Sequence, residues 1–237
     1  MRRFYQRVEV AAEGAAHRVL LDGRPLHTPA KRALALPSAA LAEALALEWQ
    51  AQSEIIRPHE MPLTRLASTA QDRMPGLRRA AIEEAAGYAR TDLLCYRAAH
   101  PIDLVERQRH GWQPLLDWAA EVYGARLAVT TTLTPAAQPD AALARLRAAV
   151  EDLADWPLVG VHALTTALGS LVLGLAVAER RLDAGQALAA SLLDELYEIE
   201  RWGKDAETEQ RHDALWREVD AAARFLERLP ARRAESS

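Results

Sequence analysis

The feature that most constrains this chain is the segment at residues 156–178, which contains no Asp, Glu, Lys or Arg. No polar stripe runs along it, and a helix that is apolar on every side must be enclosed on every side. Its length is close to the roughly 20 apolar residues that cross a bilayer. However, it contains three glycines, two threonines, a serine and a histidine, and neither end carries the basic cluster or aromatic belt of a spanning helix. We therefore expect the central helix of a soluble helical domain, without stable membrane insertion, and keep a membrane-associated protein as the alternative.

The composition narrows the classes of protein to which the chain can belong. Its 237 residues fit one or two domains with a substantial core. Half of the residues are hydrophobic and only 5% are aromatic, which favours closely packed helices filled by alanine. The net charge of −4 argues against nucleic acid as a partner, because phosphate binding normally needs a basic excess.

The expected compartment follows from the cysteine content and the N-terminus. Cys95 is the single cysteine of the sequence, so an internal disulfide is impossible and a reducing compartment is indicated. The first residues run directly into a strand-like pattern, without the apolar core of a signal peptide or a serine-rich transit segment. We expect a cytoplasmic protein.

The first third of the chain has the pattern of half-buried strands. Val8 and Val10 alternate with charged residues, at the period of two that strands show. Asp22-Gly23 follows an apolar run and predicts a tight hairpin that requires positive φ. We predict an antiparallel meander over residues 4–36.

A helix is expected to cover one side of that sheet. Pro37-Ser38 predicts its start, with Ser38 as the N-cap. Leu41, Leu45 and Trp49 then lie on one face, at intervals of four residues. Residues 53–57 predict a further strand before a turn-rich stretch. Residues 1–70 should thus form a small α+β domain that contains the meander and a helix.

From Pro62 onward the apolar residues follow the helical period of 3.6. Helices are predicted over residues 62–73, 77–90, 101–123, 139–153, 156–178, 184–202 and 206–229. Pro114 should kink or split its helix, and Gly124 should close it. Residues 231–237 should fray. The two parts should join compactly near residues 58–75, so residues 71–237 form a larger all-α domain.

The search for catalytic, cofactor and metal motifs is negative. The glycines at positions 160, 169 and 174 lie inside the apolar segment without the lysine of a phosphate loop, so they fit packing notches better. His59-Glu60 lacks the second histidine of a zinc-protease helix. Cys95 fits a buried, inert thiol better than a nucleophile, and His162 fits a satisfied core residue better than a catalytic base. We predict no catalytic residue, cofactor or metal, and keep a helical enzyme of unknown reaction as an alternative.

One segment, residues 192–203, combines apolar and acidic residues in a way that suggests a surface. If it is helical, its core stripe consists of four residues: Leu188, Leu192, Leu196 and Ile199. Glu195 then lies at the edge of this apolar face, whereas Asp194, Glu198 and Arg201 point outward. Glu195 is either half of an ion pair with an arginine or a charge presented to a partner beside an exposed apolar strip.

Two further residues of this segment are candidates for partner binding. Glu200 flanks the stripe on its other side and is the weaker of them. Trp202 precedes the glycine that ends the helix. It fits a staple between helices better than the alternative, an aromatic anchor of the kind enriched at interfaces.

Seven short blocks of the sequence together resemble one family, the ATP synthase assembly chaperones called ATP twelve. The blocks are residues 3–5, 20–29, 48–49, 61–67, 91–97, 168–172 and 197–203. They follow one another over nearly the whole chain, which is more specific than any single motif. Mitochondrial members carry a transit peptide that is absent here, so the chain is similar to an alphaproteobacterial member.

The resemblance implies a non-enzymatic chaperone that binds the free α subunit of the F-type ATP synthase catalytic head until that subunit joins β. It implies a small α+β domain followed by an orthogonal helical domain, in the cytoplasm of bacteria and in the mitochondrial matrix of eukaryotes. In the family the acidic residue before the Tyr-x-Ile-x-x-Trp-Gly block is associated with function, and that position here is Glu195. We therefore predict that Glu195, Glu200 and Trp202 contact the client, whose apolar subunit interface would otherwise aggregate.

Overall fold

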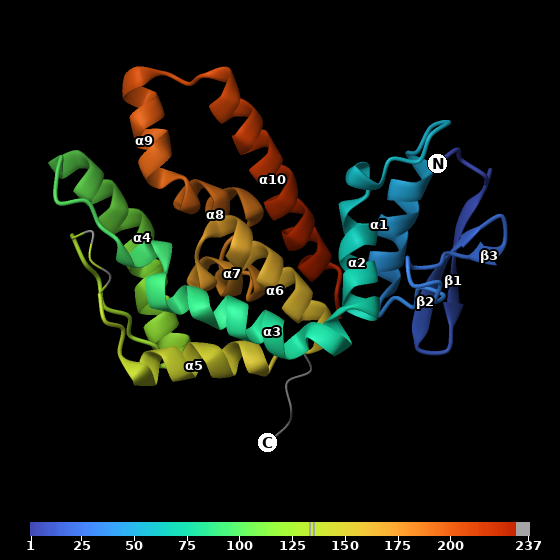
Figure 1. Ribbon diagram of the computed structural model, residues 1–237, viewed down its shortest axis with the longest axis horizontal. Coiled ribbons are helices and arrows are strands. Elements are labelled where there is room, and N and C mark those ends of the chain that lie inside the picture. The colour runs from blue at the N-terminus through green and yellow to red at the C-terminus, as the bar shows by residue number, and fades with distance from the viewer. Residues whose placement is uncertain (133, 135, 231–237) are drawn as a thin grey trace.

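The computed structural model describes residues 1–230 except positions 133 and 135. The N-terminal part contains β1 (Val8–Glu13), β2 (Ala16–Leu21), β3 (Arg24–Pro25) and α1 (Ala39–Gln50). The rest contains α2 (Pro62–Asp72), α3 (Met74–Gly87), α4 (Ile102–Tyr123), α5 (Asp140–Glu151), α6 (Asp155–Leu168), α7 (Leu171–Ala178), α8 (Ala184–Ser191), α9 (Leu193–Trp202) and α10 (Ala206–Glu227), with short 3₁₀ turns at Pro58–Glu60, Tyr88–Thr91 and Leu93–Cys95. The strands and α1 lie at one end and the helical body at the other, with α2 between them (Figure 1). The predicted α+β class is confirmed.

The three strands form an antiparallel sheet in the order β1-β2-β3. Asp22 and Gly23 have φ values of 49° and 77°, as the predicted hairpin requires. The α1 helix packs on β1 and β2, and the Ser38 side chain caps it by accepting from the Leu41 N–H at 3.1 Å. The predicted strand at residues 53–57 is wrong: the structure has only an isolated bridge there, between Ile55 and Arg2.

A half-buried carboxylate joins α1 to α2. Glu48 accepts hydrogen bonds from the N–H groups of Leu63 and Thr64, at 2.7 and 2.9 Å, in the first turn of α2. Because a helix leaves its first N–H groups without partners, this carboxylate acts as a cap supplied by another helix. Burial raises the pKa of Glu48 in spite of these bonds. Tyr5 donates to the Trp49 carbonyl at 2.7 Å beside it. Three of the resembling blocks, residues 3–5, 48–49 and 61–67, therefore meet in one structural joint.

The uncharged segment forms two helices, so the predicted single helix is wrong. The α6 helix ends at Gly169, whose φ is 68°, and Ser170 caps α7 by accepting from the Leu173 N–H at 3.0 Å. Glycine with positive φ followed by serine is a C-cap directly before an N-cap. Every residue from 171 to 177 is buried, and α6 and α7 pack on each other. Among the described helices none combines the length and the apolar character needed to cross a bilayer.

Several other helix boundaries differ from the prediction. The α3 helix begins at Met74 rather than at residue 77. The α4 helix runs through Pro114 as one helix, so of the two predicted alternatives, a kink or a split, the split is wrong. The predicted helix over residues 184–202 is broken at Leu192, where φ is −96° and ψ is 12°. This turn buries Leu192 and directs α9 toward α4. The predicted fraying at residues 231–237 lies outside the described residues.

Candidate functional site

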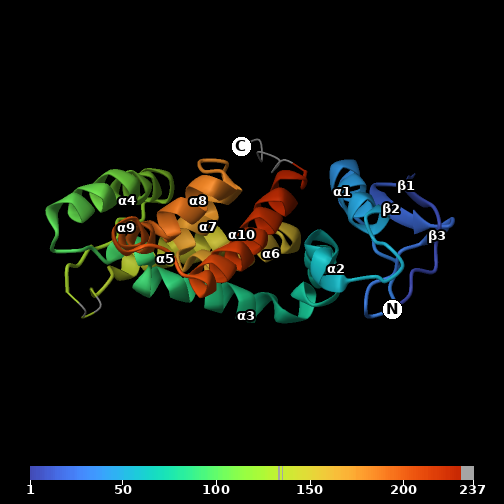
Figure 2. The ribbon, with the colours of Figure 1, turned by 90° about the horizontal axis from the view of Figure 1, so that it is seen from above.

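The α9 helix lies between α4 and α10, at the end of the molecule remote from the sheet (Figure 1). The view from above again places α9 beside α4 (Figure 2). Of the ten described residues of α9, only Tyr197 is buried. The predicted core stripe is therefore wrong in part, because Leu196 is 37% exposed. The turn at Leu192 shifts the helical phase, so the residues before and after it do not share one face.

Polar groups hold α9 against α4. Asp103 accepts hydrogen bonds from the Tyr197 hydroxyl at 2.7 Å and from Arg201. The guanidinium of Arg201 lies 3.7 Å from the centre of the Tyr197 ring, and that of Arg107 lies 5.2 Å away. Such cation–π contacts reinforce the ion pair. We call these four residues, Asp103, Arg107, Tyr197 and Arg201, the α4 clamp.

The α4 clamp is extended by two more side chains of α9. Arg107 donates to Glu200 at 2.8 Å, and Gln108 donates to Asp194 at 2.7 Å. Asp194 and Arg201 are exposed, as expected, but both also contact α4, which the sequence did not indicate. The hydrogen bonds from Tyr197 and Arg201 lower the pKa of Asp103 to about 2, so this carboxylate is ionised at neutral pH. The clamp fixes one face of α9 against α4. We call the opposite face, which borders α10 and solvent, the free face of α9.

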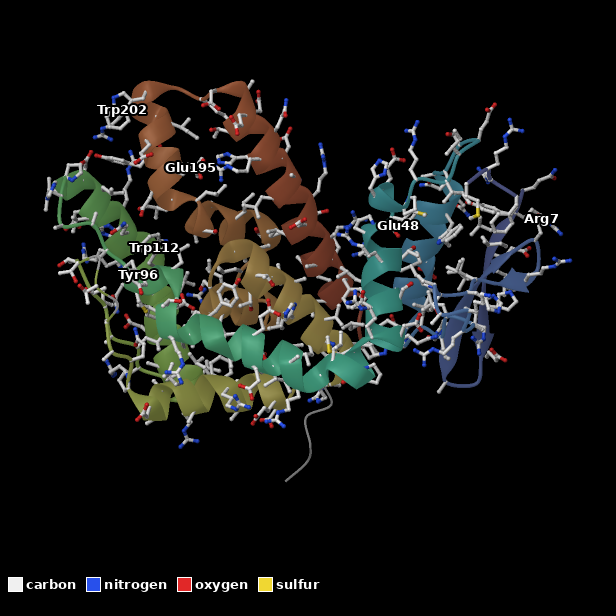
Figure 3. The ribbon with its side chains drawn as sticks, viewed as in Figure 1. Arg7, Glu48, Tyr96, Trp112, Glu195 and Trp202 are labelled. Carbon is white, nitrogen blue, oxygen red and sulfur yellow. The ribbon has the colours of Figure 1, made fainter. Side chains whose placement is uncertain are left out.

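Glu195 lies on that other face and is directed at α10 (Figure 3). Its Oε1 accepts a hydrogen bond from Arg211. His212 Nε2 lies 3.0 Å from the same oxygen, within ion-pair distance but without hydrogen-bond alignment. Burial raises the pKa of Glu195, but Arg211 and His212 together outweigh it, so that pKa lies below its ordinary value. The side chain remains 27% exposed.

Trp202 shares this free face of α9. At 100° per residue, Glu195, Ile199 and Trp202 lie within about 60° of one another around the helix. Trp202 is 78% exposed, so the interpretation as a staple between helices is wrong. The structure thus brings two of the predicted partner-binding residues, Glu195 and Trp202, onto one face. The third, Glu200, lies on the α4 side and is half of an ion pair there.

Sequence reasoning did not identify the partners of α9, namely Asp103, Arg107, Arg211 and His212. Only one local signal was present: Tyr197 and Arg201 are four residues apart and therefore share a helix face. Their acceptor, Asp103, is 94 residues from Tyr197 in the chain, and no spacing in the sequence indicates that pairing.

Two further resembling blocks, residues 91–97 and 168–172, meet in the core. The fully buried Asp92 accepts hydrogen bonds from the Ser170 hydroxyl at 2.7 Å and from the N–H groups of Leu94 and Val172, both at 3.1 Å. Burial raises the pKa of Asp92 to about 6. Burial, together with the nearby Asp92, also raises the pKa of Cys95 to about 12, which fits the expected inert thiol. This cluster therefore joins the 3₁₀ turn at Leu93–Cys95 to the start of α7.

The remaining candidates for chemistry have ordinary partners. His162 Nε2 lies 2.9 Å from Glu84, so the histidine has a partner as expected, but its side chain is 28% exposed and the residue does not lie in the core. Within the described residues there is no group of three or more His, Cys, Asp or Glu side chains that could hold a metal ion.

Comparison with known proteins places this geometry in a family. Residues 2–120 match the family described as ATP12 chaperone protein. The chain belongs to the ATP12 chaperone family. The mitochondrial protein atp12 of Schizosaccharomyces pombe is 25% identical over 215 residues, which cover 85% of this chain and 74% of that protein.

Solved structures agree over nearly the whole length. The crystal structure of Atp12 from Paracoccus denitrificans is 43% identical with a TM-score of 0.91, and the match covers 97% of this chain and 98% of that one. A structure from Agrobacterium tumefaciens is 40% identical with a TM-score of 0.90, covering 97% and 86%. The family expected from the seven blocks is confirmed, as are its role in ATP synthase assembly and the similarity to alphaproteobacterial members of the ATP12 family.

Proposed function

We propose that this ATP12 family member binds the free α subunit of the F-type ATP synthase and covers the apolar surface that this subunit later buries against β. An unassembled subunit exposes such a surface, and large exposed apolar patches aggregate. The chaperone acts by covering the surface and has no catalytic role. The observation that carries the proposal is the free face of α9, where Glu195 and the exposed Trp202 lie about two helical turns apart on a helix whose opposite face is held by the α4 clamp.

The free face of α9 has the composition of a contact surface. Trp202 is the most exposed large hydrophobic side chain of the helix, and the 37% exposed Leu196 lies on the adjoining surface. Tryptophan is enriched among residues that contribute most to binding, because it buries a large area at small entropic cost. The Glu195 carboxylate adds a charge that favours a basic group in the partner.

The α4 clamp favours binding by fixing the helix beforehand. Ordering a loose helix at the moment of contact costs free energy, and a preformed surface avoids that cost. The interface is small and mixed in polarity, which suits a chaperone that must give up its client to the larger β interface. Membrane insertion and catalysis play no part in this mechanism.

The proposal is tested by measuring the affinity of the purified chaperone for isolated α subunit, with isolated β subunit as the comparison. Trp202→Ala should weaken α binding about 30-fold, as for a central interface aromatic, and Glu195→Lys should reverse the local charge and abolish it. Leu47→Ala serves as the control, because Leu47 is 64% exposed on α1, at the other end of the molecule. Equal binding of α by all variants would show that the site is elsewhere, and preference for β would overturn the proposed client.

A further inference from the structure

We infer that Arg211 is an internal substitute for a basic side chain of the client, so that client binding exchanges one cationic partner of Glu195 for another. The inference rests on the proposed function, because it assumes that Glu195 faces the client. It adds the chemistry of the contact, a lysine or arginine of the client set in an apolar surface, and a residue of this chain that competes for that contact.

The first argument is the arrangement of two side chains of α10, Arg211 and His212, around one carboxylate oxygen. Arg211 and His212 both contact Glu195 Oε1. The His212 side chain is only 10% exposed, whereas that of Arg211 is 55% exposed. His212 therefore lies on the inner side of the carboxylate and Arg211 on the solvent side. A cation that arrives from solvent meets Glu195 where Arg211 now lies.

The second argument is that Arg211 can leave at small cost. Ion pairs between exposed side chains contribute little to stability, because water solvates both partners well when they separate. Arg211 also has a second acidic group within electrostatic reach. The pKa of Asp205, the N-cap of α10, is lowered mainly by hydrogen bonding to Thr208 and also by the charge of Arg211. A displaced Arg211 thus remains near a carboxylate.

The third argument is the contrast with the other side of α9. Arg201 is tied both to Asp103 and to the ring of Tyr197, whereas for Arg211 the described contacts with α9 are those with Glu195. The exchange therefore changes one ion pair and leaves α9 in place. In the absence of client, Arg211 keeps Glu195 paired and lowers the affinity of the face, which favours release.

The test compares the affinity of isolated α subunit for the full-length chaperone and its variants. Arg211→Ala and Arg211→Gln should each bind the client about two- to five-fold more tightly, because an exposed competing ion pair has been removed. Alanine and glutamine are both good helix formers, so α10 should keep its structure in both variants, which circular dichroism verifies. Arg217→Gln is the matched control, since Arg217 is an exposed arginine of the same helix and its loss changes the net charge equally. Its affinity should stay within twofold of the wild type.

The outcomes separate the inference from the function on which it rests. Unchanged or weaker binding by both Arg211 variants, while Glu195→Lys abolishes binding, overturns the inference and leaves the proposed site intact. An equal gain in affinity for Arg217→Gln also overturns it, because general charge would then explain the effect. Normal binding by Glu195→Lys overturns the site itself, and the Arg211 inference with it.

Discussion

Helices α7 and α9 are both short, but they are held in place by different forces. The eight residues of α7 include seven buried ones, from 171 to 177, so α7 is held by apolar packing from all sides. The ten residues of α9 include one that is buried, among those the structure describes, and α9 is held against α4 by polar contacts with Asp103 and Arg107. Apolar packing encloses a helix, whereas directional polar contacts can hold one face and leave the other free. Apolar packing on all sides therefore suits a core helix such as α7, and polar contacts on one face suit a binding surface such as α9.

The largest predicted loss of stability follows the removal of Asp92, whose carboxylate accepts hydrogen bonds from the start of the buried helix α7. Asp92→Ala leaves the Ser170 hydroxyl and the N–H groups of Leu94 and Val172 without their acceptor in the core. We expect a loss of about 4 kcal/mol in the free energy of unfolding, because each unsatisfied buried group is costly. Urea denaturation measures it. Asp92→Asn, which keeps one acceptor oxygen, should lose less, and equal stability of all three proteins would contradict the assignment of α7 to the core.

The close contact of α6 and α7 should give the next largest effect. A Cβ at Gly174 would lie 2.5 Å from Thr165 Oγ1 and 3.2 Å from its backbone nitrogen. Gly174→Ala should therefore force the helices apart and lower the free energy of unfolding by about 2 kcal/mol. Gly76→Ala is the control, because a Cβ there meets nothing within 4 Å and should stabilise α3 slightly. An unchanged free energy of unfolding in Gly174→Ala would show that the contact between α6 and α7 accommodates the added methyl group.

The same contrast explains how much of the molecule could be predicted from its sequence. The hairpin at Asp22-Gly23, the N-cap at Ser38 and the C-cap at Gly124 were predicted correctly, because each depends only on residues that are neighbours in the sequence. The break at Gly169-Ser170 could have been found in the same way, as a C-cap followed by an N-cap. It was missed because the segment is uniformly apolar.

The candidate site was less predictable for a physical reason. The position of α9 depends on Asp103, which is 94 residues from Tyr197 and 98 from Arg201 in the chain. An ion pair leaves no periodic signal, since any charged residue on a helix face has many possible partners. Periodicity therefore placed Glu195 at the edge of an apolar face and gave Asp194 and Arg201 exposed positions. It put Leu196 in the core, however, and gave no sign of the contacts that Asp194 and Arg201 make with α4.

A smaller effect tests whether the α4 clamp positions α9. Tyr197→Phe keeps the ring beside Arg107 and Arg201 and removes only the hydroxyl that donates to Asp103. The amide protons of α9 should exchange about five-fold faster, as expected for one lost hydrogen bond, while those of α7 should not change. Mass spectrometry of peptides from the two helices measures this. Trp202→Ala is the control, because its exposed side chain should not affect exchange. Equal exchange in Tyr197→Phe and wild type would show that the hydroxyl contributes nothing.

The smallest predicted effect is a difference between α7 and α9 in how their amide exchange changes at acid pH. The pKa of Asp103 is lowered to about 2 and that of Glu195 is also lowered, so their stabilising contribution is present at neutral pH and lost as the pH falls below about 4. The pKa of Asp92 is raised to about 6, so protonation of this residue favours the folded state, and its contribution increases as the pH falls from about 6 toward 4. Amide exchange, corrected for the intrinsic rate at each pH, should therefore show α9 losing protection between about pH 4 and 2 while α7 remains protected. Loss of protection in α7 before α9 would mean that the core, rather than the polar contacts of α9, is the part of the molecule that depends on ionised carboxylates.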